Sequence, residues 1–146
     1  EEGRKPKFLV WATADSLGAP LQRIQIIKGW LENGKHKEKV FDVACSDGLM
    51  VNSSNYRCPD NGAKVNIETC EVNQNSGASE LKSFWEDPDF LIDQEAFYYV
   101  RVLENPVCRW STWDSIRAGF KPRSDIPATI QERAWTSPIW FEPTKS

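Results

Sequence analysis

Ala96-Phe97-Tyr98-Tyr99-Val100-Arg101-Val102-Leu103-Glu104 is the stretch that decides the fold, because no other run holds so many aromatic and β-branched residues. As a strand, it places Tyr98, Val100 and Val102 on one face and Phe97, Tyr99, Arg101 and Leu103 on the other. Both faces carry bulk that is costly to expose to water. We therefore expect a central strand that is covered on both faces.

Strand patterns also precede this stretch. Residues 8–14 form a short apolar run that ends in a turn. Residues 23–30 and 39–45 flank the dipeptide Asn33-Gly34, which tolerates the positive φ angles of a tight hairpin. The patterns that follow predict an irregular polar excursion over 46–62, a half-exposed strand over 64–72, and a strand or a single helical turn over 80–85.

After the central strand, Asn105-Pro106 is expected to break the ladder. Ser111 predicts the N-cap of a short helix, and Gly119 predicts its end. Residues 134–141 predict a last strand, which Pro138 confines to an edge, a bulge or a strand end. About seven short strands without βαβ alternation predict an all-β fold, an immunoglobulin- or fibronectin-like antiparallel β-sandwich with one short helix.

The length of 146 residues fits one domain, which we place at 1–146. Residues 1–7 are interpreted as a linker or an artificial edge of a piece cut from a longer protein. A net charge of −3 gives no basic excess for nucleic acid, and no apolar run is long enough for insertion into a membrane. We expect neither partner.

The four cysteines, Cys45, Cys58, Cys70 and Cys108, lack C-x-x-C spacing, so we expect disulfides rather than zinc. Disulfides indicate an oxidising compartment, and four buried thiols in a cytosolic protein are the alternative. Antiparallel pairing of the hairpin with the central strand brings Cys45 level with Glu104, and Cys108 lies four residues further on. We therefore predict the pair Cys45–Cys108 and, by elimination, Cys58–Cys70.

The seven tryptophans divide into two groups. Five are expected in the core or at its margin: Trp11, Trp30, Trp85, Trp135 and Trp140. Trp110 and Trp113 are three residues apart and share one face of the expected helix. Together with their charged neighbours they form the candidate binding or docking site, because tryptophan and arginine are enriched in binding hot spots. The site residues are Arg109, Trp110, Trp113, Asp114, Glu132 and Arg133.

We expect residues 109–114 and 132–135 to lie side by side at one end of the sandwich. The alternative is a helix that caps the sandwich with its tryptophans inward. The templates of common enzymes are missing from the sequence: a glycine-rich phosphate loop, H-E-x-x-H and G-x-S-x-G. His36 and the acidic turn residues Asp87 and Asp89 are expected to be solvated. We predict no catalytic residue, no metal site and no cofactor in this chain.

Long motifs, among them AFYYVRVLENPVCRWSTWDSIRAG, PATIQERAWTSPIW and FWEDPDF, resemble the carboxy-terminal part of the bacterial family catalogued as domain of unknown function 3604. FLVWATAD, PLQRIQIIKGWL and VFDVACSDG extend the likeness over residues 8–143. The resemblance implies a longer, exported parent, periplasmic or extracellular. Its amino-terminal portion is likened to metal-dependent phosphoesterases of the polymerase and histidinol phosphatase type. The histidine-rich metal motifs of that portion have no counterpart here, so no catalytic residue carries over.

Three functions follow as hypotheses. The leading one is an accessory β-sandwich that covers or completes the amino-terminal catalytic-type domain of its parent. The second is a carbohydrate-type binding module that stacks sugars on Trp110 and Trp113. The third is a domain that lends Arg109, Glu132 or Arg133 to the active site of the parent. An apolar patch rimmed by charge would favour docking, and a flat exposed aromatic pair would favour the sugar.

Overall fold

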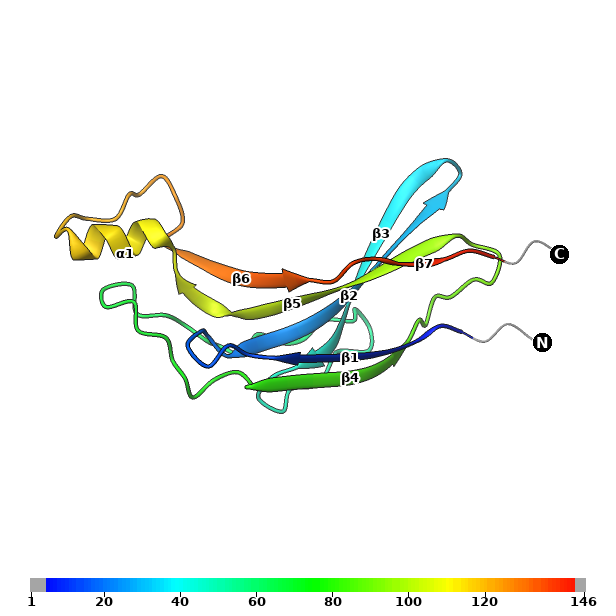
Figure 1. Cartoon of the computed structure of the whole chain (residues 1–146), viewed down its shortest axis with the longest axis horizontal. Helices are drawn as coiled ribbons and strands as arrows, with labels where there is room; N and C mark the ends of the chain where they lie inside the picture. Colours follow the sequence, from blue (N-terminus) through cyan, green and yellow to red (C-terminus); the bar gives the residue numbers. More distant parts are fainter. Residues whose placement is uncertain (1–4, 144–146) are drawn as a thin grey trace.

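The computed structural model describes residues 5–143, which fold into two antiparallel sheets and one helix (Figure 1). In chain order the elements are β1 (Lys7–Thr13), β2 (Leu21–Glu32), β3 (Lys35–Cys45), β4 (Glu80–Glu86), β5 (Ala96–Cys108), α1 (Trp110–Arg117), β6 (Thr129–Trp135) and β7 (Ile139–Phe141). The small sheet pairs β1 with β4, and the large sheet has the order β3-β2-β5-β6, with β7 also on β5. The prediction of an all-β sandwich with about seven strands and one short helix is confirmed. Lys7 belongs to β1, which shortens the predicted linker, and residues 1–4 of that linker lie outside the described residues.

The central strand is β5, as predicted. It pairs with β2 on one side and with β6 and β7 on the other. Asn105-Pro106 does not end it, although proline cannot donate a ladder hydrogen bond. A shift of register between Leu103 and Pro106 absorbs the proline, and pairing resumes as far as Cys108. Pro138, by contrast, falls in the gap between β6 and β7, so that prediction is confirmed.

The core lies between the two sheets. Ile24, Ile26 and Tyr98 of the large sheet pack against Val10 and Leu81 of the small one. The hairpin between β2 and β3 turns at Asn33 and Gly34, both with positive φ, as the dipeptide predicts. Residues 80–85 form a strand rather than the single helical turn that was the alternative, because β4 pairs along its whole length with β1. The small sheet therefore supplies the second layer of the sandwich.

Only one face of β5 is covered by a second sheet, which makes the prediction of two covered faces wrong. Phe97, Tyr99 and Arg101 point to the opposite face, the outer face of the large sheet, and are half-buried only by their neighbours. Trp30 and Trp85 pack against the core as predicted. Trp11, Trp135 and Trp140 are exposed, so their assignment to the core is wrong. Strand alternation points all three away from the space between the sheets.

The region between β3 and β4 contains no strand. Residues 64–72, predicted as a strand, instead form a turn held by the hydrogen bond from the Cys70 N–H to the Asn66 carbonyl (2.6 Å). Cys70 has a φ of 58° in this turn, a conformation incompatible with an extended strand. Val65 and Val72 remain as an isolated bridge.

The disulfides join Cys45 to Cys58 and Cys70 to Cys108, with Cα separations of 5.7 and 5.5 Å. The predicted pairing is therefore wrong. Cys45 is level with Leu103, as expected, because both are register partners of Arg23. However, β2 lies between β3 and β5, so Cys45 is two strand spacings, roughly 10 Å, from the central strand. Two residues at the same height along a sheet are close together only if their strands are neighbours.

Asp87 was expected to be a solvated turn residue, and this is wrong. Its side chain is fully buried, and its carboxylate forms an ion pair with Lys28 of β2 (2.6 Å). The pair fastens the turn after β4 to the large sheet, over the edge of the core. Asp89 is partly exposed and its carboxylate pairs with Lys39. The acidic turn thus has a structural role.

Candidate functional site

Helix α1 carries the aromatic pair of the predicted site. It begins at Trp110, with Arg109 rather than Ser111 at the N-cap and no side-chain cap. Its end is as predicted, because Gly119 follows the C-cap with a φ of 72°. The buried Thr112 donates its hydroxyl to the carbonyl of Ala128 (2.7 Å), and the N–H of Arg109 donates to the same carbonyl (2.9 Å). These two bonds fix the helix to the start of β6.

Both tryptophans of α1 reach solvent. Trp110 is 73% exposed and Trp113 is 37% exposed, so the alternative in which both point inward is wrong. The guanidinium of Arg117 lies 5.1 Å from the centre of the Trp113 ring. That cation therefore competes with a sugar for one face of the Trp113 ring. Asp114 is exposed, and Arg109 uses its Nε to donate to the Pro127 carbonyl (3.1 Å).

Glu132 and Arg133 do not join the helix. Both are exposed residues of β6, where Thr129 pairs with Cys108 beside the helix and Trp135 pairs with Arg101. At about 3.3 Å per residue, the six steps from Thr129 to Trp135 span roughly 20 Å. The two segments are therefore not side by side, and β6 runs from the helix toward the middle of the molecule (Figure 1).

Glu132 instead lines a shallow pocket of about 200 Å³ together with Glu104, Val102 and Ala134. Burial raises the pKa of Glu104, and the charges of Glu132 and Asp15 raise it further, against a backbone hydrogen bond from Ala19. Two carboxylates that share one pocket repel each other when both are ionised. The stability of this part of the fold therefore depends on pH.

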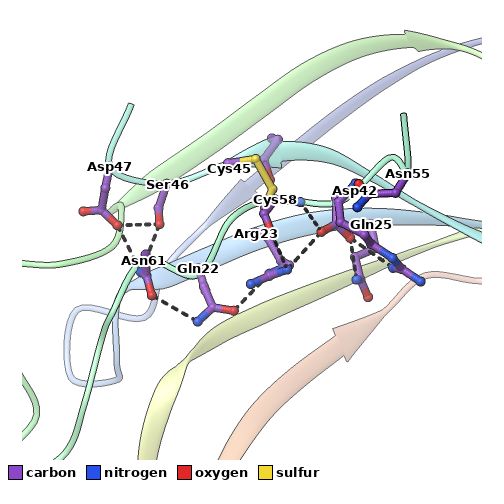
Figure 2. The surroundings of a disulfide bond; sticks show 12 residues. Gln22, Arg23, Gln25, Asp42, Cys45, Ser46, Asp47, Asn55, Cys58 and Asn61 are labelled. Atoms are coloured by element: carbon purple, nitrogen blue, oxygen red, sulfur yellow. Dashed lines mark hydrogen bonds and ion pairs between the residues drawn. A yellow bond between two sulfur atoms is a disulfide. The ribbon is translucent and has the colours of Figure 1, made fainter. Parts of the chain in front are cut away.

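A polar cluster surrounds the Cys45–Cys58 disulfide (Figure 2). At its centre, the Asp42 carboxylate accepts four hydrogen bonds, from Gln25 Nε2 (2.6 Å), Arg57 Nη1 (3.4 Å), Arg23 Nη1 (3.0 Å) and the backbone N–H of Cys58 (2.7 Å). A carboxylate has about four acceptor sites, so none of them remains for a ligand. The cluster holds residues 55–58 against the edge of β3.

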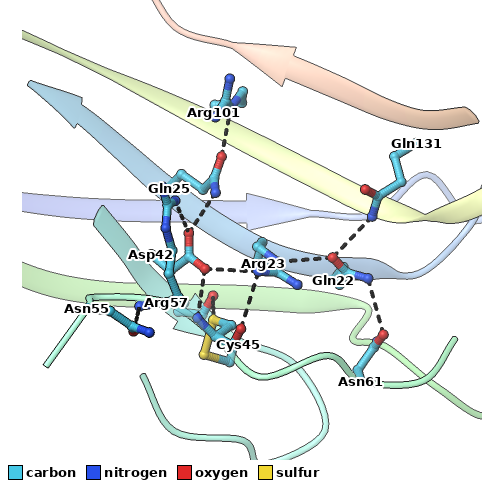
Figure 3. Close-up of polar contacts among 12 residues, drawn as sticks. Gln22, Arg23, Gln25, Asp42, Cys45, Asn55, Arg57, Asn61, Arg101 and Gln131 are labelled. Atoms are coloured by element: carbon cyan, nitrogen blue, oxygen red, sulfur yellow. Dashed lines mark hydrogen bonds and ion pairs between the residues drawn. A yellow bond between two sulfur atoms is a disulfide. The ribbon is translucent and has the colours of Figure 1, made fainter. Parts of the chain in front are cut away.

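The cluster continues across the large sheet (Figure 3). Arg101 of β5 donates to Gln25 Oε1 of β2 (2.7 Å), and Gln25 in turn donates to Asp42 of β3. In a second branch, Gln131 of β6 donates to Gln22 (3.1 Å), and Gln22 donates to Asn61 (3.2 Å). No buried side-chain nitrogen or oxygen among the described residues lacks a partner. We therefore read the cluster as a structural network that joins the disulfide loop to the sheet.

An apolar strip on the outside of the small sheet is a feature that the predicted site does not include. Leu9, Trp11 and Phe84 are 74, 68 and 64% exposed. Leu9 pairs directly with Phe84, and Trp11 lies two residues further along the same face of β1. The ammonium groups of Lys7 and Lys82 lie 5.9 and 6.0 Å from the centres of the Phe84 and Trp11 rings. We call this surface the β1–β4 strip.

The β1–β4 strip was missed at the level of sequence, although a signal exists. β1 has large apolar residues on both faces, with Phe8 and Val10 toward the core and Leu9 and Trp11 away from it. A strand with two apolar faces is typical of burial on both sides. The second face has no cover among residues 5–143.

Within residues 5–143, no group of three or more His, Cys, Asp or Glu side chains could hold a metal ion. The one helix of this part of the chain is too short and too polar to cross a membrane.

A family model described as a protein of unknown function (DUF3604) matches residues 1–143. No curated protein and no solved structure matches the chain.

Proposed function

Because the chain belongs to the DUF3604 family of proteins of unknown function, we propose that it is a non-catalytic accessory β-sandwich that docks through its β1–β4 strip. Its partner is an amino-terminal catalytic-type domain of the same parent chain, a metal-dependent hydrolase exported to the periplasm or beyond. The chain itself needs no cofactor in this role. Two disulfides support an oxidising compartment.

The observation that carries the proposal is the exposure of Leu9, Trp11 and Phe84 on one face of two paired strands. Single exposed apolar residues are ordinary, but a contiguous group rimmed by charge marks an interaction surface. The rim charges are already paired, Lys7 with Glu86 (2.8 Å) and Lys82 with Glu80 (3.2 Å). The surface is therefore suited to an apolar partner that stays in place rather than to a charged one.

The imbalance of the two sheets supports the same proposal. A two-stranded sheet is marginal by itself and owes its order to packing on the large sheet. A domain that covers its outer face would bury the second apolar side of β1. The small sheet would then lie between the large sheet on one side and the partner domain on the other.

The test uses the full-length parent with Trp11→Glu and Phe84→Glu combined. If the strip docks, the charges should uncouple the two domains, seen as separate calorimetric transitions and faster proteolysis between them. Trp135→Glu is the matched control, because Trp135 is 60% exposed on the other sheet and should leave the coupling intact. An unchanged melting profile and cleavage rate in the double variant would contradict docking at this face.

Carbohydrate binding is the second candidate, favoured by the exposure of Trp110. Aromatic rings that face solvent can stack on sugar rings, although Arg117 already occupies a face of Trp113. Affinity electrophoresis against soluble polysaccharides tests this candidate. Retardation that Trp110→Ala abolishes would support sugar binding, and equal migration of both proteins in every polysaccharide would reject it. The third hypothesis, in which Arg109, Glu132 or Arg133 serves the active site of the parent, gains no support from their separation.

A further inference from the structure

A second concave surface lies at the opposite end of the large sheet from α1. It is a pocket of about 350 Å³ between the tip of the β2–β3 hairpin and the ends of β5 and β7. Figure 1 shows the hairpin diverging from β7 at this end of the molecule. The volume falls in the range of small-molecule sites. We call it the hairpin pocket.

Aromatic side chains line the hairpin pocket. Phe97 and Trp140 are register partners on the outer face, with ring centres 5.2 Å apart. A Cβ on Gly29 would lie 2.2 Å from the Phe97 ring, so this ring lies directly over the bare backbone of β2. Leu31, which is exposed, adds a third apolar wall. A glycine in the middle of a strand is costly, and here it makes room for the ring.

The acidic residues of the pocket lie on the same face. Strand alternation places Glu38 on the face of Gly29, its register partner, and places Glu95 and Glu142 two residues from Phe97 and Trp140. Glu95 directly precedes Ala96 and Glu142 directly follows Phe141, so the two glutamates are next to this antiparallel pair and oppose each other. Like charges opposed across two strands are destabilising.

No described residue forms a salt bridge with Glu38, Glu95 or Glu142. Lys37 also borders the pocket, but alternation points it to the other face, where it pairs with Glu32 (3.8 Å). His36 also lines the pocket, and no salt bridge joins it to any of these three carboxylates. The pocket thus combines an aromatic floor with three carboxylates that form no salt bridge with any residue among 5–143.

We propose that the hairpin pocket binds an organic cation with an apolar body, such as a quaternary ammonium. The aromatic faces attract the charge and pack on the methyl groups, while the carboxylates supply the opposite charge. Binding would also relieve the repulsion between Glu95 and Glu142. This site is independent of the β1–β4 strip, so either proposal can fail alone.

The test compares choline with 3,3-dimethylbutan-1-ol, a neutral molecule of nearly the same shape. In a titration of the ¹⁵N-labelled protein followed by NMR, choline should shift the Trp140 indole and the amides near Glu95 saturably. The neutral alcohol should bind about fivefold more weakly, because it lacks the cation–π attraction. Added salt should weaken only the binding of choline. The proposal is overturned if choline causes no saturable shift or binds no better than the alcohol.

Variants separate the charge from the shape of the pocket. Glu95→Gln with Glu142→Gln should weaken choline binding about fivefold and leave the alcohol unaffected. Trp140→Ala should weaken the binding of both choline and the alcohol. Trp135→Ala and Glu132→Gln remove the same kinds of side chain from β6, which does not line the pocket, and should change neither affinity. Equal losses in the controls and in the pocket variants would also overturn the proposal, and the amide spectrum of each variant reports whether it is folded.

Discussion

Lys28 is a charged residue placed in the core, with 3% of its side chain exposed. Its Nζ donates to Asp87 Oδ2 (2.6 Å) and to the Asp89 carbonyl (2.8 Å), and the Tyr98 hydroxyl donates to the same Asp87 oxygen (2.7 Å). Burial, together with the hydrogen bond to Asp87 and its charge, raises the pKa of Tyr98, so the hydroxyl stays protonated and keeps donating. These contacts compensate two buried charges.

Asp87→Ala should be strongly destabilising, because it leaves the Lys28 ammonium in the core without its counter-ion. We expect a loss of about 3–5 kcal/mol in the free energy of unfolding, measured by urea titration. Glu86→Ala is the matched control, since it breaks a solvent-exposed pair with Lys7 and should cost at most about 1 kcal/mol. Similar losses in the two variants would show that the buried pair is not a major support of the fold.

Glu104 gives the fold a pH dependence whose sign is fixed by its raised pKa. The folded state binds the proton more tightly than the unfolded state, so stability is lost as the pH rises from the ordinary value of 4.5 through the raised pKa. Glu104→Gln should therefore stabilise the protein at pH 7 and have little effect near pH 4. Urea titrations at both pH values measure this, with Glu71→Gln as an exposed control. A stabilisation of the same size at both pH values would contradict the assignment.

At the scale of elements, the two disulfides hold the long excursion between β3 and β4. Cys45–Cys58 closes a separation of 13 residues beside the Asp42 cluster, and Cys70–Cys108 closes a separation of 38 residues onto the end of β5. Few backbone ladders hold this region, since its bridges are isolated ones. Its order therefore rests on the disulfides and on the polar cluster.

Replacing each disulfide by two serines should cost more for the longer loop. The chain-entropy relation gives about 3 kcal/mol for Cys45–Cys58 and about 4 kcal/mol for Cys70–Cys108. Denaturant titrations of the two double variants measure the difference. Peptide mapping without reduction checks the pairing first, and recovery of a Cys45–Cys108 peptide would contradict the topology. If the shorter loop proved the more stabilising, local packing rather than chain entropy would set the order.

At the scale of the whole molecule, the two sheets are unequal, and each has an outer face with exposed aromatic residues. Packing between the sheets accounts for the core, but it leaves the β1–β4 strip and the hairpin pocket without a cover from the described residues. Apolar surface left in contact with water favours association. The molecule is thus a sandwich with two candidate contact surfaces at different places.

The isolated chain should self-associate weakly through the β1–β4 strip. The mass of the wild-type chain, measured by size-exclusion chromatography with light scattering, should rise with concentration. In the variant Trp11→Lys with Phe84→Lys the mass should stay near that of the monomer, because charge opposes burial of the strip. Trp135→Lys should have a smaller effect on the mass. A wild-type chain that stays monomeric at every concentration would show that the strip is too small to associate by itself.

The sequence alone determined features that depend on neighbouring residues. The density of aromatic and β-branched residues predicted the position of β5. Asn33-Gly34 predicted the hairpin turn, and Gly119 predicted the end of α1. The family could also be predicted, because long motifs persist along the chain. Each of these follows from local backbone preference or from the order of residues, which the sequence states directly.

Tertiary structure decided what depends on the lateral order of strands and on which faces are covered. Cys45 pairs with Cys58 because β2 separates β3 from β5, a fact that no spacing along the chain contains. Trp11 and Trp140 are exposed because the sandwich has no third layer among the described residues, although both look like core residues in sequence. The candidate surfaces escaped prediction for the same reason. Alternation assigns a side chain to one of two faces, but only the packing of the sheets decides which face meets water.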